Sequence, residues 1–203
     1  MDEKIILFDW DDTLFSKAEY KKNLRGNLAR ICEVSEEEIF ELEEKYFDNL
    51  INSGDFQIDD FVRTFSQRFN KKINLEDFST DRLGIYSRAL FPETIGVLNK
   101  LKINFQLGIY SQGFDSLQKI KIKSSGIENF FDQNLIYINR NKLDPEFIKK
   151  LPNDVIVIED KKEVIEKLKD TGRFQLFWIN RIDDQKIEGV TTIKNLGELV
   201  NLI

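Results

Sequence analysis

The sequence predicts an α/β protein in which a doubly wound parallel sheet carries helices on both faces and an α-helical segment is inserted after the first strand. Two observations lead to this fold class. From residue 91 onward, short apolar runs alternate with amphipathic helical segments. Between residues 16 and 90, the chain instead consists of long, charged, amphipathic segments. A length of 203 residues suits one such domain with a modest insertion.

Strands are expected at short apolar runs that are bounded by turn signals. Residues 4–8 form the first of these runs, and residues 155–158 consist wholly of β-favouring aliphatic side chains. The predicted strands are 4–8, 105–110, 134–138, 155–158, 174–179 and 190–193.

Helices are expected where apolar residues recur with a period near 3.6. In the inserted segment, Ser35 and Glu38 have the spacing of a capping box, and Phe61, Phe65 and Phe69 form a stripe that predicts a buried helix face. A turn is expected at residues 52–55. The predicted helices are 18–32, 36–51, 58–69, 74–90, 93–101, 116–125, 145–151, 163–170 and 195–202.

The composition excludes several classes of catalytic site. The chain has no histidine, which removes Ser-His-Asp triads, Cys-His pairs and histidine-ligated zinc. Its single cysteine, Cys32, excludes an internal disulfide and is expected to be a small core residue. Any acid–base chemistry is therefore expected from carboxylates, lysine, tyrosine or water.

The charge and hydropathy bear on partners and location. The formal charge is −6 and no long basic run appears, so we expect no nucleic-acid partner. The cluster Lys119–Lys123 is expected to be a solvated helix face. The apolar runs are too short to span a membrane, and no signal peptide is visible. We expect a cytoplasmic protein with no membrane partner, present as a monomer or a weak homodimer.

An acidic run follows the first predicted strand. Asp9, Asp11 and Asp12 come within four positions, although like charges this close repel and are costly to desolvate. In an extended segment, the side chains of Asp9 and Asp11 point the same way, and Thr13 adds a hydroxyl. Mg²⁺ prefers oxygen ligands and would neutralise the cluster, so this run indicates a metal site. The alternative for the motif taken alone is a solvated turn.

Polar residues also follow two later strands. Ser111 comes at the end of the strand 105–110, where its hydroxyl can donate to a phosphate oxygen. Glu159 and Asp160 follow the strand 155–158 directly. The alternative for the segment at Ser111, taken alone, is an ordinary turn. Because ligands of parallel sheets bind at the carboxyl ends of the strands, we expect these side chains to lie at one edge.

These features, taken in order, resemble the four motifs of the haloacid dehalogenase (HAD) superfamily. Asp9 to Thr13 match the first motif, DxDx[T/V], and Ser111 matches the second. Lys142 stands in a segment similar to the third motif, K-P-D-P, with Leu143 in place of the first proline. Glu159 and Asp160 resemble the fourth motif in the form found in the β-phosphoglucomutase-like and phosphatase branch.

The resemblance implies a Rossmann-like HAD core formed by residues 1–15 and 91–203, with a C1-type helical cap formed by residues 16–90. The cap would close over the site and select the substrate. The fourth motif departs from its usual pattern because Val164 and Ile165 stand where another Asp is common. Glu163 is then an alternative metal ligand beside the acidic pair.

The same resemblance implies a role for each site residue. Asp9 would be the nucleophile and Asp11 the general acid and base. Ser111 and Lys142 would hold phosphoryl oxygens, with Lys149 or Lys150 as fallbacks for the lysine. Mg²⁺ would be the cofactor, with the Trp10 backbone carbonyl as a further ligand beside the metal-binding carboxylates. These carboxylates are Asp9, Asp11, Glu159 and Asp160.

We therefore predict a Mg²⁺-dependent phosphomonoester hydrolase that acts on a small phosphorylated metabolite through an aspartyl-phosphate. One alternative is a phosphomutase of the β-phosphoglucomutase type, which would use the same residues. Another is a non-catalytic module that binds phosphate or phosphoproteins. A haloacid dehalogenase is disfavoured because that branch usually lacks the second aspartate, which is present here as Asp11.

Overall fold

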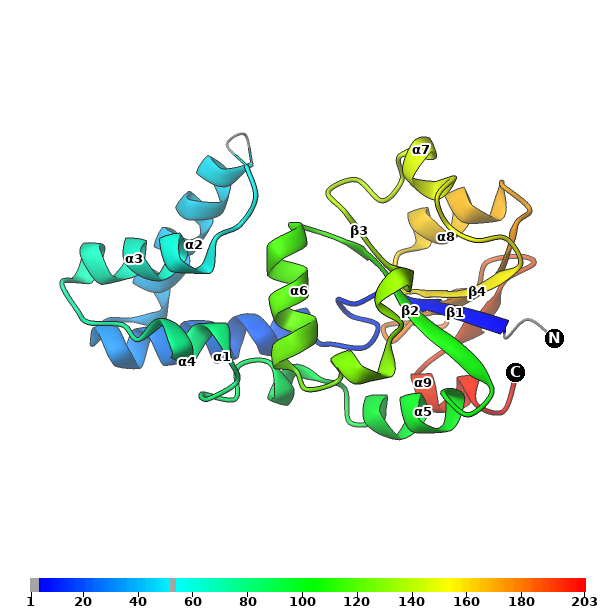
Figure 1. Cartoon of the computed structure of the whole chain (residues 1–203), viewed down its shortest axis with the longest axis horizontal. Coiled ribbons are helices and arrows are strands. Elements are labelled where there is room, and N and C mark those ends of the chain that lie inside the picture. Colours follow the sequence, from blue (N-terminus) through cyan, green and yellow to red (C-terminus); the bar gives the residue numbers. More distant parts are fainter. Residues whose placement is uncertain (1–3, 52–53) are drawn as a thin grey trace. The chain divides into compact units, whose positions relative to one another are not determined.

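The computed structural model describes residues 4–51 and 54–203 and contains a six-stranded sheet with the strand order β3-β2-β1-β4-β5-β6 (Figure 1). The strands are β1 (Lys4–Phe8), β2 (Phe105–Gln112), β3 (Ile136–Asn139), β4 (Val155–Glu159), β5 (Phe174–Ile179) and β6 (Thr191–Ile193). All of these strands pair in parallel with their neighbours. The doubly wound α/β fold is thereby confirmed, with the change in winding direction falling between β1 and β4.

The sheet is covered by helices on both faces because its strands carry apolar side chains in both directions. Leu7, Val157 and Leu176 lie in register on β1, β4 and β5 and belong to a core cluster that includes residues of α7 and α8. Helices α5 and α9 lie on the other side of the sheet (Figure 1). These helices are α5 (Thr94–Leu101), α7 (Pro145–Ile148), α8 (Lys162–Lys169) and α9 (Leu196–Leu199).

The chain divides into two compact units, each described by itself. The sheet unit contains the residues up to Ser16, Leu90–Gly113 and Ile127–Ile203, including two 3₁₀ turns at Glu128–Phe130 and Gln133–Leu135. The helical unit contains Lys17–Ala89 and Phe114–Gly126. The segment 114–126, which the sequence assigned to the core domain, thus packs with the helical unit. The domain limits expected from the sequence stay a prediction.

The helical unit has the first three helices close to their predicted limits. Ser35 and Glu38 form the capping box of α2, and Phe61 and Phe65 of α3 are buried. Cys32 is also buried, which agrees with its predicted place in the core. Within the predicted turn at 52–55, Asn52 and Ser53 lie outside the described residues. The helices of this unit are α1 (Lys17–Cys32), α2 (Glu36–Leu50), α3 (Ile58–Phe69), α4 (Leu75–Ser79) and α6 (Asp115–Ser124), with a 3₁₀ turn at Ser87–Ala89.

The single helix predicted over 74–90 is wrong. The regular helix ends after α4, where Thr80 adopts an extended conformation. The Asp81 carboxylate then accepts hydrogen bonds from the backbone N–H groups of Tyr86 and Ser87, at 2.8 and 3.2 Å. Gly84 has a φ of +64° in the same turn. Aspartate competes with helix formation by bonding nearby backbone donors, which is the physical reason for the break.

The predicted solvated face of Lys119–Lys123 needs a correction. Lys121 is buried, and its ammonium lies 5.0 Å from the ring centroid of Tyr20 on α1. A buried methylene stem and a cation–π contact therefore place this residue inside the helical unit.

None of the helices among residues 4–51 and 54–203 has both the length and the apolar character needed to cross a membrane.

Replacing Gly108 on β2 with alanine is expected to lower the free energy of unfolding by about 1–3 kcal/mol, as overpacking does. A Cβ at Gly108 would lie 2.5 Å from the backbone oxygen of Leu135 and 2.7 Å from the Leu7 side chain. Urea denaturation of the purified variant measures the loss.

The matched control is Gly96→Ala on α5. Gly96 is exposed, and a Cβ there meets no atom within 4 Å. This substitution is expected to be neutral or to stabilise the protein by up to about 1 kcal/mol, because alanine favours helix. Equal stabilities for the two variants would contradict the close approach at β2.

Candidate active site

Three acidic residues meet at the carboxyl edge of the sheet. Asp9 follows β1 directly, and its backbone N–H donates to the Ile158 oxygen of β4 at 2.8 Å, which continues the pairing of the two strands. Glu159 ends β4 and Asp160 comes next. Each of the three residues offers one carboxylate oxygen, and these oxygens all lie within 4.8 Å of one another.

Lys142 is the cation of this cluster. It stands in the loop after β3, and its side chain is fully buried. Its Nζ donates to Asp9 Oδ1 at 2.7 Å and to Glu159 Oε2 at 2.6 Å. Tyr110 fixes the loop because its hydroxyl donates to the backbone oxygen of Lys142, and the Lys142 ammonium lies 5.4 Å from the Tyr110 ring centroid. The structure therefore brings Lys142 directly to Asp9.

The electrostatics of Lys142 follow from these contacts. Burial alone would lower the pKa of its ammonium, because a low dielectric disfavours charge. The adjacent carboxylates of Asp9 and Glu159 outweigh burial and raise the pKa above its ordinary value. The lysine is thus a permanent positive charge at neutral pH.

The neighbouring carboxylates of Glu159 and Asp160 have different surroundings. Glu159 uses one oxygen for Lys142, and its other oxygen accepts from the backbone N–H of Lys161 at 3.0 Å. Asp160 Oδ1 is buried and has no hydrogen-bond partner among the described residues. Its backbone oxygen accepts from the Trp178 indole at 2.7 Å. Burial, followed by repulsion from Asp9, raises the pKa of both carboxyl groups.

A divalent cation fits this arrangement. A buried acceptor without a partner, such as Asp160 Oδ1, is costly unless a ligand completes it, and carboxylate oxygens are the donors that Mg²⁺ prefers. Asp9, Glu159 and Asp160 would hold the ion. Asp11 and Glu163 are not part of this group, and Glu163 is exposed on α8.

The metal role expected of the Trp10 carbonyl does not fit. That oxygen accepts hydrogen bonds from the backbone N–H groups of Leu14 and Phe15, each at 3.1 Å. Its two lone pairs are therefore used by the turn that follows β1. The Trp10 ring is fully buried and lies 5.4 Å from the Phe15 ring, between ring centroids.

The remaining predicted residues occupy separate positions. Asp11 is half-buried, two residues beyond Asp9, and Ser111 is buried on β2, paired in register with Ile138 of β3. Their predicted roles stay predictions. The fallback lysines, Lys149 and Lys150, are exposed, so only Lys142 of the three candidates reaches Asp9.

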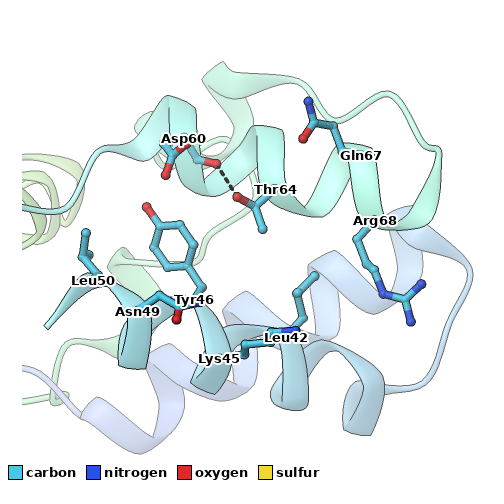
Figure 2. Close-up of a pocket in the computed structure, with 9 residues that line it drawn as sticks. All are labelled: Leu42, Lys45, Tyr46, Asn49, Leu50, Asp60, Thr64, Gln67 and Arg68. Atoms are coloured by element: carbon cyan, nitrogen blue, oxygen red, sulfur yellow. Dashed lines mark hydrogen bonds between the residues drawn. The ribbon is translucent and has the colours of Figure 1, made fainter. Parts of the chain in front are cut away.

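Asp9 is not among the lining residues of two cavities in the described parts of the chain. One, of about 580 Å³, lies between α2 and α3 of the helical unit, where Lys45, Arg68 and Asp60 mix opposite charges (Figure 2). The other, of about 520 Å³, lies in the sheet unit and is lined by Asp160 together with residues of β5 and the loop after it. Of these two cavities, the second reaches a residue of the acidic cluster.

The sequence analysis missed three residues that support the site. Tyr110 and Trp178 bond to the backbones of Lys142 and Asp160, and Arg181 follows β5 at the same edge of the sheet. The position of Arg181 after a strand was an available signal, but the segment reads as a charged loop. The contacts of Tyr110 and Trp178 have no sequence signal, because aromatic residues in strands usually indicate core.

The fold is shared with proteins of known structure. The chain is similar to a HAD phosphatase from Thermococcus onnurineus over 98% of its own length and 97% of that chain, with a TM-score of 0.58 and 22% identity. It is also similar to YfnB from Bacillus subtilis, a proposed HAD-hydrolase solved with magnesium, over 100% and 99%, with a TM-score of 0.62 and 15% identity.

Dehalogenases have the same architecture. A 2-haloacid dehalogenase from Pseudomonas syringae matches over 98% of this chain and 97% of that chain, with a TM-score of 0.62 and 16% identity. No protein-family model matches the chain, and no curated protein matches it in sequence. These full-length similarities show that the chain has the fold of the HAD-like hydrolase superfamily.

The metal-free protein is expected to lose stability as the pH rises through the range from about 4 to about 9, which the raised pKa values of Glu159 and Asp160 define. A carboxyl group with a raised pKa binds its proton more tightly in the folded than in the unfolded state, so stability falls where the unfolded state has already ionised. Lys142 adds no slope here, because its raised pKa acts only above the ordinary lysine value.

Urea denaturation in EDTA at several pH values measures this slope. Mg²⁺ should reduce it, since the ion binds the ionised carboxylates. Asp160→Asn should also reduce it, whereas Glu163→Gln, an exposed carboxylate on α8, should not. A slope of the opposite sign, or equal slopes for the two variants, would contradict the burial of charge at this site.

Proposed function

We propose that the chain is a Mg²⁺-dependent phosphomonoester hydrolase that acts through an aspartyl-phosphate on Asp9. The observation that supports this most is the fully buried Lys142, which bonds to Asp9 beside Asp160, a carboxylate with an unpartnered buried oxygen. A nucleophile that is held in one orientation is what attack on phosphorus requires. The fold of known HAD phosphatases and hydrolases is consistent with this chemistry.

The proposed reaction has two steps. An oxygen of Asp9 forms a bond to phosphorus while the bond from phosphorus to the leaving oxygen breaks, and Asp11 donates a proton to that leaving oxygen. Asp11 then removes a proton from water, whose oxygen attacks the phosphorus and releases inorganic phosphate and free Asp9. Both steps use the same pair of carboxylates, so no histidine is needed.

The other residues stabilise charge and position. Lys142 lies against Asp9 and would hold the negative phosphoryl group close to the nucleophile. Ser111, at the end of the neighbouring strand, would donate to a phosphoryl oxygen. Glu159 keeps Lys142 in place through its own ion pair. The cation, when bound, would offset the charge that the phosphoryl group and the carboxylates bring together.

Dehalogenases have the same fold, but two observations favour phosphate chemistry. Three carboxylates gather beside one lysine, which suits a site that takes a divalent cation. The second aspartate of the acidic run is present as Asp11, where an acid for an alkoxide leaving group is required. A halide ion needs no proton when it leaves.

Asp9→Asn is expected to lower phosphate release by more than about 10³-fold while the protein stays folded, because an amide cannot act as the nucleophile. Release from a panel of phosphomonoesters, measured with Mg²⁺ and with EDTA, is the test. Asp12→Asn is the matched control, since it removes a charge from the same run at a residue with a φ of +63°, which asparagine tolerates.

Wild-type activity in Asp9→Asn would contradict the mechanism. A phosphorylated protein that resists water and returns its phosphate to a second hydroxyl would instead indicate a phosphomutase. A folded protein that binds Mg²⁺ but releases no phosphate from any substrate would favour a phosphate-binding module.

Asp160→Asn is expected to raise the Mg²⁺ concentration for half-maximal activity by at least about tenfold, because the variant loses a carboxylate ligand with an otherwise unpartnered oxygen. Glu163→Gln should leave the titration unchanged. Metal titrations of the wild type and the two variants with one substrate compare these outcomes. A shift in Glu163→Gln alone would indicate that Glu163, rather than Asp160, binds the metal.

A further inference from the structure

We propose that Arg181 is a positioning residue for Asp11, because it holds the backbone turn that directly follows this aspartate. The proposal rests on the function proposed above, in which Asp11 is the general acid. It concerns residues of the sheet unit alone. Arg181 lies 169 residues from Asp12 in the sequence but bonds to its backbone.

The turn after Asp11 has a strained and specific conformation. Asp12 has a φ of +63°, and its backbone N–H donates to the Phe15 oxygen at 2.6 Å. The Trp10 oxygen closes the turn from the other side through Leu14 and Phe15. A left-handed residue other than glycine persists only where its surroundings hold it. The groups that hold this turn therefore fix the backbone position of Asp11.

Side chains from distant segments bind three successive carbonyls of this turn. Arg181 Nη2 donates to the Thr13 oxygen at 3.0 Å, and Arg181 Nε lies 3.4 Å from the Asp12 oxygen. The third carbonyl, of Leu14, accepts from the buried Thr94 hydroxyl at 2.8 Å. Because each of these backbone acceptors is bonded to a side chain, the turn cannot change its peptide orientations without losing hydrogen bonds.

Arg181 is itself held by an ion pair and by a contact with an aromatic ring. Its Nη1 pairs with Glu93 Oε1 at 2.8 Å, and both side chains are largely shielded, with exposed fractions of 21% and 24%. Its guanidinium carbon lies 3.6 Å from the ring centroid of Phe91. Only arginine offers a planar fork that stacks on a ring, pairs with a carboxylate and reaches two carbonyls at once.

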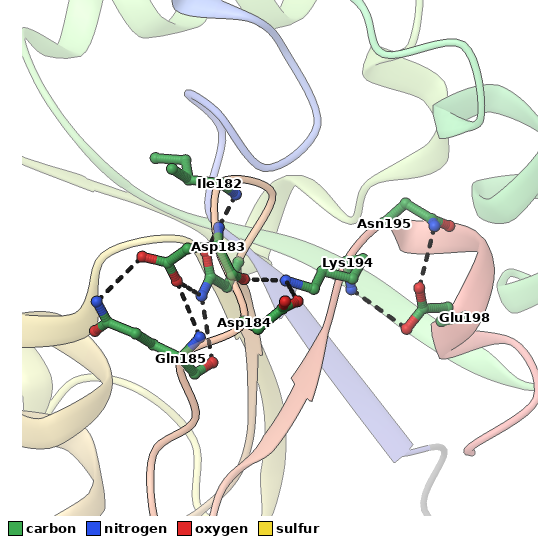
Figure 3. Close-up of polar contacts among 8 residues, drawn as sticks. Ile182, Asp183, Asp184, Gln185, Lys194, Asn195 and Glu198 are labelled. Carbon is green, nitrogen blue, oxygen red and sulfur yellow. Dashed lines mark hydrogen bonds and ion pairs between the residues drawn. The ribbon is translucent and has the colours of Figure 1, made fainter.

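The loop that presents Arg181 is also tied down. The buried Asn180 accepts from the backbone N–H groups of Ile182 and Asp183, and its amide donates to Asp183 Oδ1 at 2.7 Å. Lys194 pairs with Asp184 at 2.9 Å and donates to the Asp183 backbone oxygen (Figure 3). Hydrogen bonds within the loop on both sides of Arg181 fix its backbone. The guanidinium is therefore presented from a fixed position and can hold the turn in place.

The consequence for catalysis is selective. A misplaced Asp11 donates its proton poorly to a leaving oxygen, and this matters most when the leaving group is a strong base, such as an alkoxide. A nitrophenolate leaves without a proton. Loss of Arg181 should therefore slow the hydrolysis of alkyl phosphates much more than that of nitrophenyl phosphate.

The test compares kcat/KM for an alkyl phosphate and for p-nitrophenyl phosphate in wild type, Arg181→Gln and Arg173→Gln. Arg173 is a matched control, because it also bonds to two backbone carbonyls, of Ile148 and Leu151, but at the amino end of the sheet. We expect Arg181→Gln to lower the alkyl-to-aryl ratio of kcat/KM by about tenfold or more. Arg173→Gln should lose stability without changing that ratio.

An unchanged ratio in folded Arg181→Gln would overturn the proposal, as would an equal change in Arg173→Gln. If Arg181→Gln fails to fold, Arg181→Lys takes its place and should show a smaller change in the same direction. Amide hydrogen exchange of a peptide covering residues 9–16 is a second readout, independent of turnover. It should be faster in Arg181→Gln than in either wild type or Arg173→Gln, and unchanged exchange would also overturn the proposal.

The exchange measurement separates this proposal from the proposed function. A wild-type protein that releases no phosphate from any substrate would remove the phosphatase. Faster amide hydrogen exchange in Arg181→Gln would then still support the inference that Arg181 stabilises the turn. Phosphate release with unchanged ratio and unchanged exchange would retain the phosphatase and remove Arg181 as a positioning residue.

Discussion

A buried ammonium keeps its charge only beside anions, and the ion pairs of Lys142 with Asp9 and Glu159 are the interaction on which the site of this protein depends. Transfer of these groups out of water costs several kcal/mol for each ion, which the pairing must offset. The three residues come from the end of β1, the end of β4 and the loop after β3. In the observed strand order, β1 lies between β2 and β4 and β3 lies next to β2, so the carboxyl ends of these strands meet at one edge of the sheet.

The same cluster explains why a divalent cation suits the site. Asp9, Glu159 and Asp160 bring three negative charges, and Lys142 brings one positive charge, so the ionised group has a formal charge of −2. Burial and repulsion from Asp9 raise the pKa of Glu159 and Asp160. A divalent cation balances the charge, and it also completes the unpartnered oxygen of Asp160. Metal affinity and the ionisation of Glu159 and Asp160 are therefore parts of one electrostatic balance.

Much of the fold and part of the site could be predicted from the sequence, because both depend on local patterns. Apolar runs gave the strands, and the rule that parallel sheets bind ligands at their carboxyl ends singled out Asp9, Glu159 and Asp160. The helix predicted over 74–90 failed where a side chain, Asp81, competes for the backbone. The burial of Lys121 escaped prediction for a different reason: it depends on a packing partner far away in the sequence, and a basic helix face gives no sign of one.

Different interactions hold Asp9 and the turn after Asp11, and this difference explains which of them could be predicted from the sequence. Asp9 is held by charge, and charged residues at strand ends are visible in a sequence. The turn after Asp11 is held by backbone carbonyls that accept from Arg181 and Thr94, and a carbonyl has no sequence signature. The division also suits two different tasks. A nucleophile must be presented in one orientation, which the ion pair of Asp9 with Lys142 secures, whereas a proton donor must be placed beside the leaving oxygen. The ion pair acts on the carboxylate of Asp9 itself, whereas Arg181 and Thr94 act on the backbone that follows Asp11.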